Sequence, residues 1–305
     1  MGNDAAPQVK GEAITLWWVT SMARLDKARR ILTPRKLLYL LGSHNFLFVA
    51  DEGLALAGQT IYDQPPQLIK GWRNDFQPCV VIFVGLQQTH WSGLPAAITI
   101  ARVMGIDTIL MPTPPGGNNL TVAETVESYG WLSKALNGRP FYVYAFSKGG
   151  FDALWLISAT KLVQQCRHFF GISVPFRGTR MAEVIDGPAA KELLPDSSQV
   201  LATQVLLCEL HDQGLAVTLG GGIIDIVCPR SNCRPSNTDN YCPPPWWKIA
   251  WPRLTHFLRG KWYSPPGEPW YWCRTMVQVG HTALYNLFIA IHVALDALRA
   301  ERRRN

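Results

Sequence analysis

The order of apolar segments after residue 78 restricts the fold of this chain more than any other feature of its sequence. Short runs rich in β-branched and aromatic residues alternate there with longer segments of helical spacing. Strands are predicted at 79–84, 108–111, 141–146, 168–173, 215–219 and 276–279, and helices at 94–104, 121–136, 151–163 and 283–299. Repeated strand–helix units form βαβ crossovers, so we expect an α/β fold with a mostly parallel central sheet and helices on both faces.

The composition fits a globular core interrupted by one irregular insertion. Of 305 residues, 48% are hydrophobic and 17% charged, a balance that excludes a disordered chain. Residues 229–272 carry nine prolines and six of the twelve tryptophans. Proline cannot donate to a strand ladder, so this segment is expected outside the sheet. We predict an extension with the first sheet elements at 1–75, including a hairpin at 45–50 and 54–58. The hydrolase-type core is expected at 76–228 and 273–305, and a Trp/Pro-rich cap or lid at 229–272.

The charge pattern gives no positive sign of a nucleic-acid partner. The net charge is +7, and the basic residues gather at 29–36 and in the tail at 299–304. Solvated helix faces explain such clusters, and no nucleic-acid-binding module accompanies them. The first residues lack the basic-then-apolar order of a signal peptide, and no run reaches the roughly 18 apolar residues of a membrane span. The cytoplasm is the default expectation for the location, and export stays open.

The cysteines do not show the spacing of a metal site. Seven cysteines are present, and Cys228, Cys233 and Cys242 fall in one loop, with Cys273 further along. No CxxC pair occurs, so neither a metal nor another cofactor is expected. Free thiols and a loop disulfide both remain open for these four residues.

Ser147 stands where an apolar strand passes directly into a helix. A serine in such a tight turn has a strained backbone, so the residues two before and two after it must be small. Ala145 and Gly149 meet that condition. The hydroxyl would project above the carboxyl edge of the sheet, at the positive end of the next helix. The alternative is a serine that simply caps an ordinary helix.

Four segments in chain order resemble the α/β-hydrolase superfamily, within its lipase and esterase branches. They are the strand and turn at 82–86, the nucleophile elbow at 145–149, the turn at 172–179 and the strand and loop at 218–229. Val84 replaces the histidine usual in the first, and Ala145 replaces the first glycine of Gly-x-Ser-x-Gly. The resemblance extends over roughly residues 78–300 and implies a serine nucleophile served by a base and an acid.

The resemblance also implies the chain order serine, acid, histidine for the triad. His281 follows the last predicted strand and precedes the last helix, where the family places its base. Asp225 follows the strand at 215–219, where the family places its acid. The predicted triad is therefore Ser147, Asp225 and His281. The competing late residues are His211, His256 and His292 for the base, and Glu209, Asp212 and Asp239 for the acid.

The same resemblance implies an oxyanion hole built from two backbone N–H groups. They belong to Lys148, next to the nucleophile, and to Leu86, with Gln87 as the alternative. The Lys148 ammonium itself is expected in solvent.

The candidate substrate-binding residues are aromatic: Trp246, Trp247, Trp251 and Phe176. Rings of this kind suit an apolar pocket or a membrane surface, although they also pack irregular loops. A small-molecule or lipid ester with an apolar acyl part is the expected substrate.

The predicted function is that of a serine hydrolase that cleaves carboxylic esters through an acyl-enzyme. An acyltransferase or a thioesterase could use the same triad, and the sequence does not separate these activities. A non-catalytic, hydrolase-like binding protein is a third reading, which Val84 and Ala145 favour and the intact triad order opposes. Dinucleotide binding is poorly supported, because Gly220–Gly222 lacks the later glycine and the acidic residue of that fingerprint.

Overall fold

The computed structural model of the chain describes residues 67–86, 88, 90–113, 119–224, 227–228, 230–233, 235, 252, 255, 273–279 and 286–304. The predicted hairpin at 45–50 and 54–58 lies outside these residues. So does nearly all of the predicted cap at 229–272, which therefore stays a prediction.

The described strands form one seven-stranded sheet with the order β1-β3-β2-β4-β5-β6-β7. The strands are β1 (Leu68–Ile69), β2 (Cys79–Phe83), β3 (Thr108–Leu110), β4 (Phe141–Phe146), β5 (Cys166–Ile172), β6 (Ala216–Ile224) and β7 (Cys273–Val279). Only β1 pairs antiparallel, and every other pairing among them is parallel. The predicted mostly parallel sheet is therefore confirmed, and the carboxyl ends of β2 to β7 meet at one edge.

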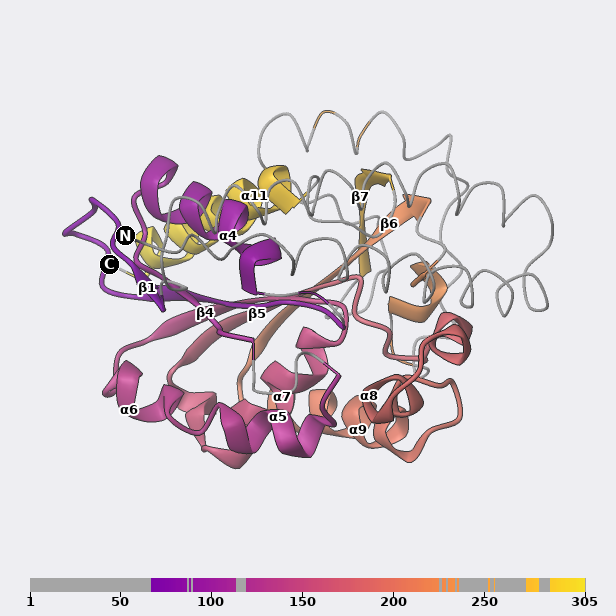
Figure 1. Cartoon of the computed structure of the whole chain (residues 1–305). Helices are drawn as coiled ribbons and strands as arrows, with labels where there is room; N and C mark the ends of the chain where they lie inside the picture. The colour runs from indigo at the N-terminus through magenta and orange to yellow at the C-terminus, as the bar shows by residue number, and fades with distance from the viewer. Residues whose placement is uncertain are drawn as a thin grey trace, which may run out of the picture.

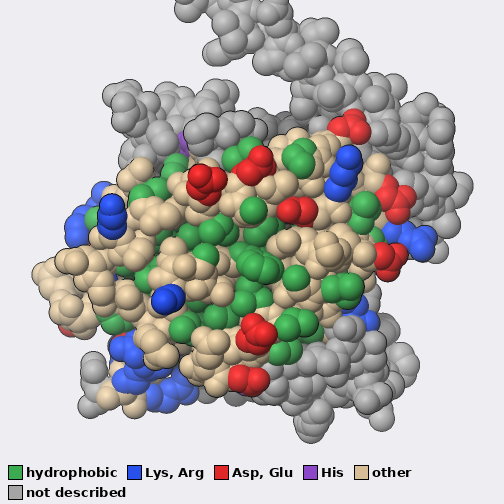
Figure 2. Space-filling view, turned by 90° about the horizontal axis from the view of Figure 1, so that it is seen from below, with side chains coloured by type: hydrophobic (Ala, Val, Ile, Leu, Met, Phe, Trp, Pro, Cys, Tyr) green, Lys and Arg blue, Asp and Glu red, His purple; other side chains and the backbone are tan. Residues whose placement is uncertain are grey.

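Helices cover both faces of this sheet (Figure 1). One face carries α4 (His90–Ile98), its π-helical continuation η2 (Thr99–Val103) and α11 (Asn286–Arg302). The other face carries α5 (Val122–Ser128), α6 (Leu132–Leu136), α7 (Gly149–Ala159), α8 (Pro188–Glu192) and α9 (Ser198–Asp212). Figure 2 shows the outer surface of this second layer, where apolar side chains gather near the centre and charged ones lie toward the margin.

Alternate side chains of the central strands feed two separate cores. Val81 of β2 and Val143 of β4 pack with the α7 and α9 layer. Their neighbours Ile82 and Tyr142 pack with the α4 and α11 layer. This two-sided burial explains why the strands are continuous apolar runs, since a strand with one wet face would alternate.

Several predicted elements differ in their bounds from the observed ones. The helix predicted over 121–136 is broken into α5 and α6. Tyr129, which follows α5 at the break, is buried and donates its hydroxyl to the Pro112 carbonyl at 2.7 Å. The helix predicted from 94 already starts at His90. The strand predicted at 215–219 continues to Ile224, because the glycines at 220–222 pair with β7.

Candidate active site

Ser147 occupies a strained turn between β4 and α7. Its φ is +52°, a left-handed conformation that is uncommon for a residue with a side chain. Its N–H donates to the Ile172 carbonyl at 3.0 Å, and its own carbonyl accepts from the Gly150 N–H at 3.0 Å. These bonds hold the turn from both sides, and strain of this kind persists only where its surroundings enforce it.

The residues around Ser147 are small because the turn lies tightly against the segments that follow β2 and β5. A Cβ on Gly149 would lie 2.5 Å from the Val84 carbonyl oxygen, which is a fixed backbone atom. A Cβ on Gly150 would lie 2.3 Å from the Val174 side chain. Ala145 is fully buried in β4. Only glycine fits at 149 without moving the main chain, so the elbow spacing follows from packing.

The segment after β2 passes directly beside Ser147. A Cβ on Gly85 would lie 2.9 Å from the Ser147 Cβ. The Gly85 N–H donates to Gln88 Oε1 at 2.9 Å, and the Gln88 N–H returns a bond to the Gly85 carbonyl at 3.2 Å. The Gly85 donor is thus occupied. This leaves the next residue, Leu86, as the candidate oxyanion donor on this segment, while the alternative Gln87 lies outside the described residues.

The expectation of a solvated Lys148 side chain is wrong. Only 1% of the residue is exposed, and its Nζ lies 2.7 and 2.9 Å from the two carboxylate oxygens of Asp152. A third bond of 3.3 Å reaches Thr125 Oγ1 on α5. Burial raises the pKa of Asp152, and the adjacent ammonium opposes that shift. The sequence signal was an acidic residue four positions after a lysine, which is also common on wet helix surfaces.

Ser173 is a second strained serine that the sequence analysis did not single out. It follows β5 as Ser147 follows β4, has a φ of +51°, and is fully buried. Its N–H donates to the Gly220 carbonyl at 2.6 Å, while its Oγ has no hydrogen-bond partner among the described residues. Because Phe146 and Ile172 are aligned in the sheet, Ser147 and Ser173 end adjacent strands at the same level.

Phe176 lies in the core and not in an open pocket. It is fully buried, and its ring stacks on Phe151 of α7 at a centroid distance of 6.1 Å. The proposed substrate contact for this residue is corrected accordingly. The turn at 172–179 needs an apolar anchor under α7, and a sequence does not distinguish such an anchor from a pocket wall.

The remaining predicted site residues lie outside the described residues: Asp225, His281, Trp246, Trp247 and Trp251. The elements before the first two are described, since β6 ends at Ile224 and β7 at Val279. Both strands end at the same edge as Ser147, because the sheet is parallel there.

The structure removes three of the competing residues. Glu209, His211 and Asp212 lie at the end of α9, before β6 begins at Ala216. The strand rises about 3.3 Å per residue from Ala216 to Gly220, and the Gly220 carbonyl is bonded to Ser173 at the carboxyl edge. The end of α9 therefore lies on the order of 13 Å or more from that edge, measured along the strand. His292 is buried within α11. Among the described histidines, His90 is the one that begins a helix at the Ser147 edge; its Nδ1 contacts Thr113 Oγ1 at 2.8 Å, and burial lowers its pKa.

Two further properties concern the described part of the chain alone. No group of three His, Cys, Asp or Glu side chains there is arranged to hold a metal ion. None of its helices combines the length and the apolar character that a membrane crossing requires.

Cys228 and Cys233 are buried with their Sγ atoms 3.3 Å apart, which is the contact of two thiols and not a disulfide.

Comparisons with known proteins identify no sequence family for this chain. No family model matches the chain, and no curated protein does. Solved structures that are similar include lipase B of Aspergillus fumigatus, with 14% identity over 75% of this chain and 64% of that one, at a TM-score of 0.45. A carboxylesterase of Bacillus subtilis matches with 13% identity over 76% of this chain and 85% of that one, at a TM-score of 0.40. A putative non-heme bromoperoxidase of Mycobacterium tuberculosis matches with 13% identity over 73% of this chain and 92% of that one, at a TM-score of 0.43.

The sheet order and the turn at Ser147 together give this chain the architecture of an α/β hydrolase, as predicted. One fold can host many unrelated activities, so the architecture by itself assigns no reaction. Any assignment of chemistry has to come from the residues at the site.

Proposed function

We propose that this chain is a serine hydrolase that cleaves carboxylic esters through an acyl-enzyme formed on Ser147. The observation that supports this most directly is the Ser147 backbone, held at a φ of +52° between β4 and α7. A helix cap needs no such strain, since a cap residue adopts an ordinary extended conformation. The close approach of Gly85 to Ser147 further supports the proposal, because it brings a backbone segment to where an oxyanion would form.

The proposed mechanism gives each residue one task. His281 takes the proton from Ser147 Oγ as that oxygen attacks the ester carbonyl, and Asp225 holds the imidazole in the correct tautomer. The backbone N–H groups of Lys148 and Leu86 donate to the oxyanion. The protonated His281 then gives its proton to the leaving alcohol, and water hydrolyses the acyl-enzyme by the reverse sequence of transfers.

The substrate part of the proposal is an ester with an apolar acyl chain. It rests on Trp246, Trp247 and Trp251 in the predicted cap, whose rings suit an apolar chain or a lipid–water interface. An acyltransferase or thioesterase would use the same first step and differ only in the group that accepts or carries the acyl chain.

Labelling with a fluorophosphonate tests the nucleophile directly. The wild-type protein should be labelled, and Ser147→Ala should lose the label together with roughly 10⁴-fold of kcat on a p-nitrophenyl ester. Ser173→Ala is the matched control, because it removes a neighbouring buried serine of the same backbone conformation. A label that persists in Ser147→Ala would refute the assignment, and no labelling of the wild type would favour the non-catalytic reading.

A further inference from the structure

Beneath the elbow, Lys148 is fixed at its far end by two helices. Its ammonium has three N–H donors, and three acceptors surround it: both carboxylate oxygens of Asp152 on α7 and Thr125 Oγ1 on α5. The Thr125 hydroxyl donates its hydrogen bond to the Thr121 carbonyl at 2.8 Å, so its oxygen is available to accept from Lys148. All three residues are at most 5% exposed. The ammonium is therefore fully satisfied inside the protein.

Stability alone gives a weak reason for this arrangement. Removing two charges from water costs more than their attraction commonly returns, and well-packed apolar residues of similar volume often serve as well or better. The burial-driven rise in the pKa of Asp152 is consistent with that cost. A buried pair is best explained where it fixes one arrangement of the chain among several.

What the pair fixes is the first turn of α7. The Lys148 carbonyl accepts from the Phe151 N–H at 2.8 Å and from the Asp152 N–H at 3.2 Å. The Lys148 side chain forms an ion pair with the same Asp152, so both the carbonyl and the ammonium of Lys148 are bonded to that one residue. Gly149 presses the turn against the Val84 carbonyl from the other side. The peptide between Ser147 and Lys148 is thus held by contacts on α5, α7 and β2.

We propose that Lys148 and Asp152 form a positioning pair that holds the Ser147–Lys148 peptide, so that the Lys148 N–H points at the developing oxyanion. This inference rests on the proposed function. The side chains act through the backbone, because all three N–H donors of the ammonium are already used and none is left for a substrate. Loss of the pair should therefore weaken transition-state binding more than ground-state binding, which lowers kcat and leaves KM nearly unchanged.

The double variant Lys148→Met/Asp152→Leu tests this without leaving a buried charge. It should fold with a Tm near that of the wild type and lose roughly 10- to 100-fold in kcat, with KM changed less than about twofold. Its rate of fluorophosphonate labelling should fall in parallel. Wild-type kcat and labelling rate in the folded double variant would overturn the pairing while leaving Ser147 as the nucleophile.

A second pair of variants decides the question even if the double variant does not fold. Thr125→Val removes one acceptor of the ammonium and should lower kcat by a few-fold with KM unchanged. Thr203→Val is the matched control: Thr203 is fully buried on α9 and accepts from Trp155 Nε1 of α7 at 2.9 Å, away from the elbow. If both variants lose activity only in proportion to their loss of Tm, the pair is structural and the proposal fails. Failure of the wild type to be labelled would instead count against the proposed function.

Discussion

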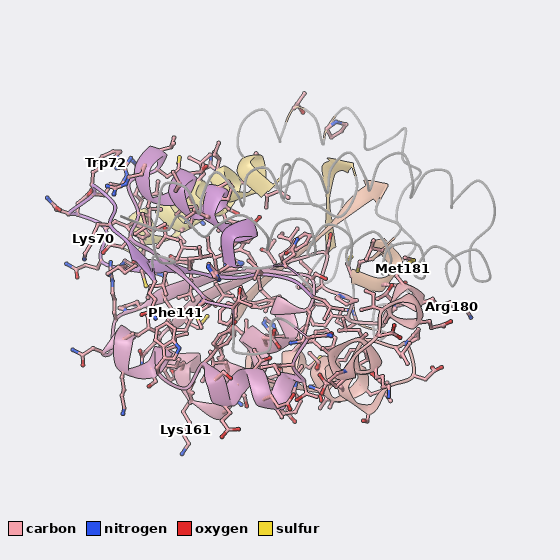
Figure 3. All side chains as sticks on the ribbon, in the orientation of Figure 1. Lys70, Trp72, Phe141, Lys161, Arg180 and Met181 are labelled. Atoms are coloured by element: carbon pink, nitrogen blue, oxygen red, sulfur yellow. The ribbon has the colours of Figure 1, made fainter. Side chains whose placement is uncertain are left out.

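Two aspartates at opposite edges of the sheet show how differently this fold treats a carboxylate with a cationic neighbour. Asp152 lies under the elbow at the carboxyl edge, is 5% exposed, and has Lys148 as its ion-pair partner. Asp107 precedes β3 at the other edge and accepts from the Gly71 N–H at 2.8 Å, Arg139 at 2.9 Å and Lys70 at 3.1 Å. Within the described part of the chain, Lys70 and Arg180 of η4 (Arg180–Val184) lie at opposite ends (Figure 3).

The pKa of the two carboxyl groups moves in opposite directions. Burial raises the pKa of Asp152, and one ammonium does not outweigh it. Burial also raises the pKa of Asp107, but the Gly71 N–H, Arg139 and Lys70 together outweigh it, so the net shift is downward. The comparison teaches that the balance between burial and ionic partners differs at the two edges. At the amino edge the partners of the carboxylate outweigh burial, and at the carboxyl edge, where the proposed chemistry takes place, burial outweighs the single ammonium.

The largest expected effect comes from removing the cation alone at the carboxyl edge. Lys148→Met should lower the free energy of unfolding by about 3–5 kcal/mol at neutral pH, because Asp152 is left buried without a counter-charge. The folded-state pKa of Asp152 then lies further above its unfolded value, so the loss should shrink as the pH falls and the carboxyl takes up a proton. Urea unfolding at several pH values measures this. A variant as stable as the wild type at neutral pH would mean that the pair is dispensable.

A smaller effect is expected at the amino edge. Asp107→Ala should lower the free energy of unfolding by about 1–2 kcal/mol at neutral pH. The variant removes the carboxylate that accepts from one backbone N–H and from two partly exposed cationic side chains. Its folded pKa lies below the unfolded value, so this stabilisation is complete above the unfolded pKa of about 3.9 and is lost as the pH falls through the folded pKa. The gap between wild type and variant should therefore close in acid. A gap that widened there would contradict the assigned direction.

Ser173→Ala sharpens the comparison within the carboxyl edge. Its Oγ is buried without a partner among the described residues, so its removal should leave stability unchanged or raise it by up to about 1 kcal/mol. Thermal unfolding beside the wild type tests this. A loss of stability would show that the hydroxyl makes a hydrogen bond in solution.

The smallest effect belongs to the exposed partner of Asp107. The Lys70 side chain is 68% exposed, so Lys70→Ala should change the free energy of unfolding by less than about 0.5 kcal/mol. Arg139→Ala is the matched comparison, because that side chain is 29% exposed and also donates to the Gln77 and Pro78 carbonyls. Equal losses in the free energy of unfolding for Lys70→Ala and Arg139→Ala would contradict the argument that burial and the number of hydrogen bonds set the contribution of each side chain.

Much of the site was predictable because its signals are local. The strand at 141–146 has its predicted bounds, since a continuous apolar run flanked by Pro140 and Ser147 permits little else. The small residues around Ser147 also indicate a tight turn by themselves. Asp225, His281 and the cap at 229–272 remain predictions.

The sequence by itself determined the alternation of strands and helices along the chain, the mostly parallel sheet that follows from it, and the tight turn at Ser147, because these depend on side-chain patterns that are local in the chain. The tertiary structure decided which of those residues face inward. Lys148 is buried because α5 brings Thr125 over it, Phe176 packs the core because α7 lies above it, and the glycines at 220–222 extend β6 because β7 runs alongside. Burial and strand pairing depend on neighbours far away in the chain, and no local pattern contains them.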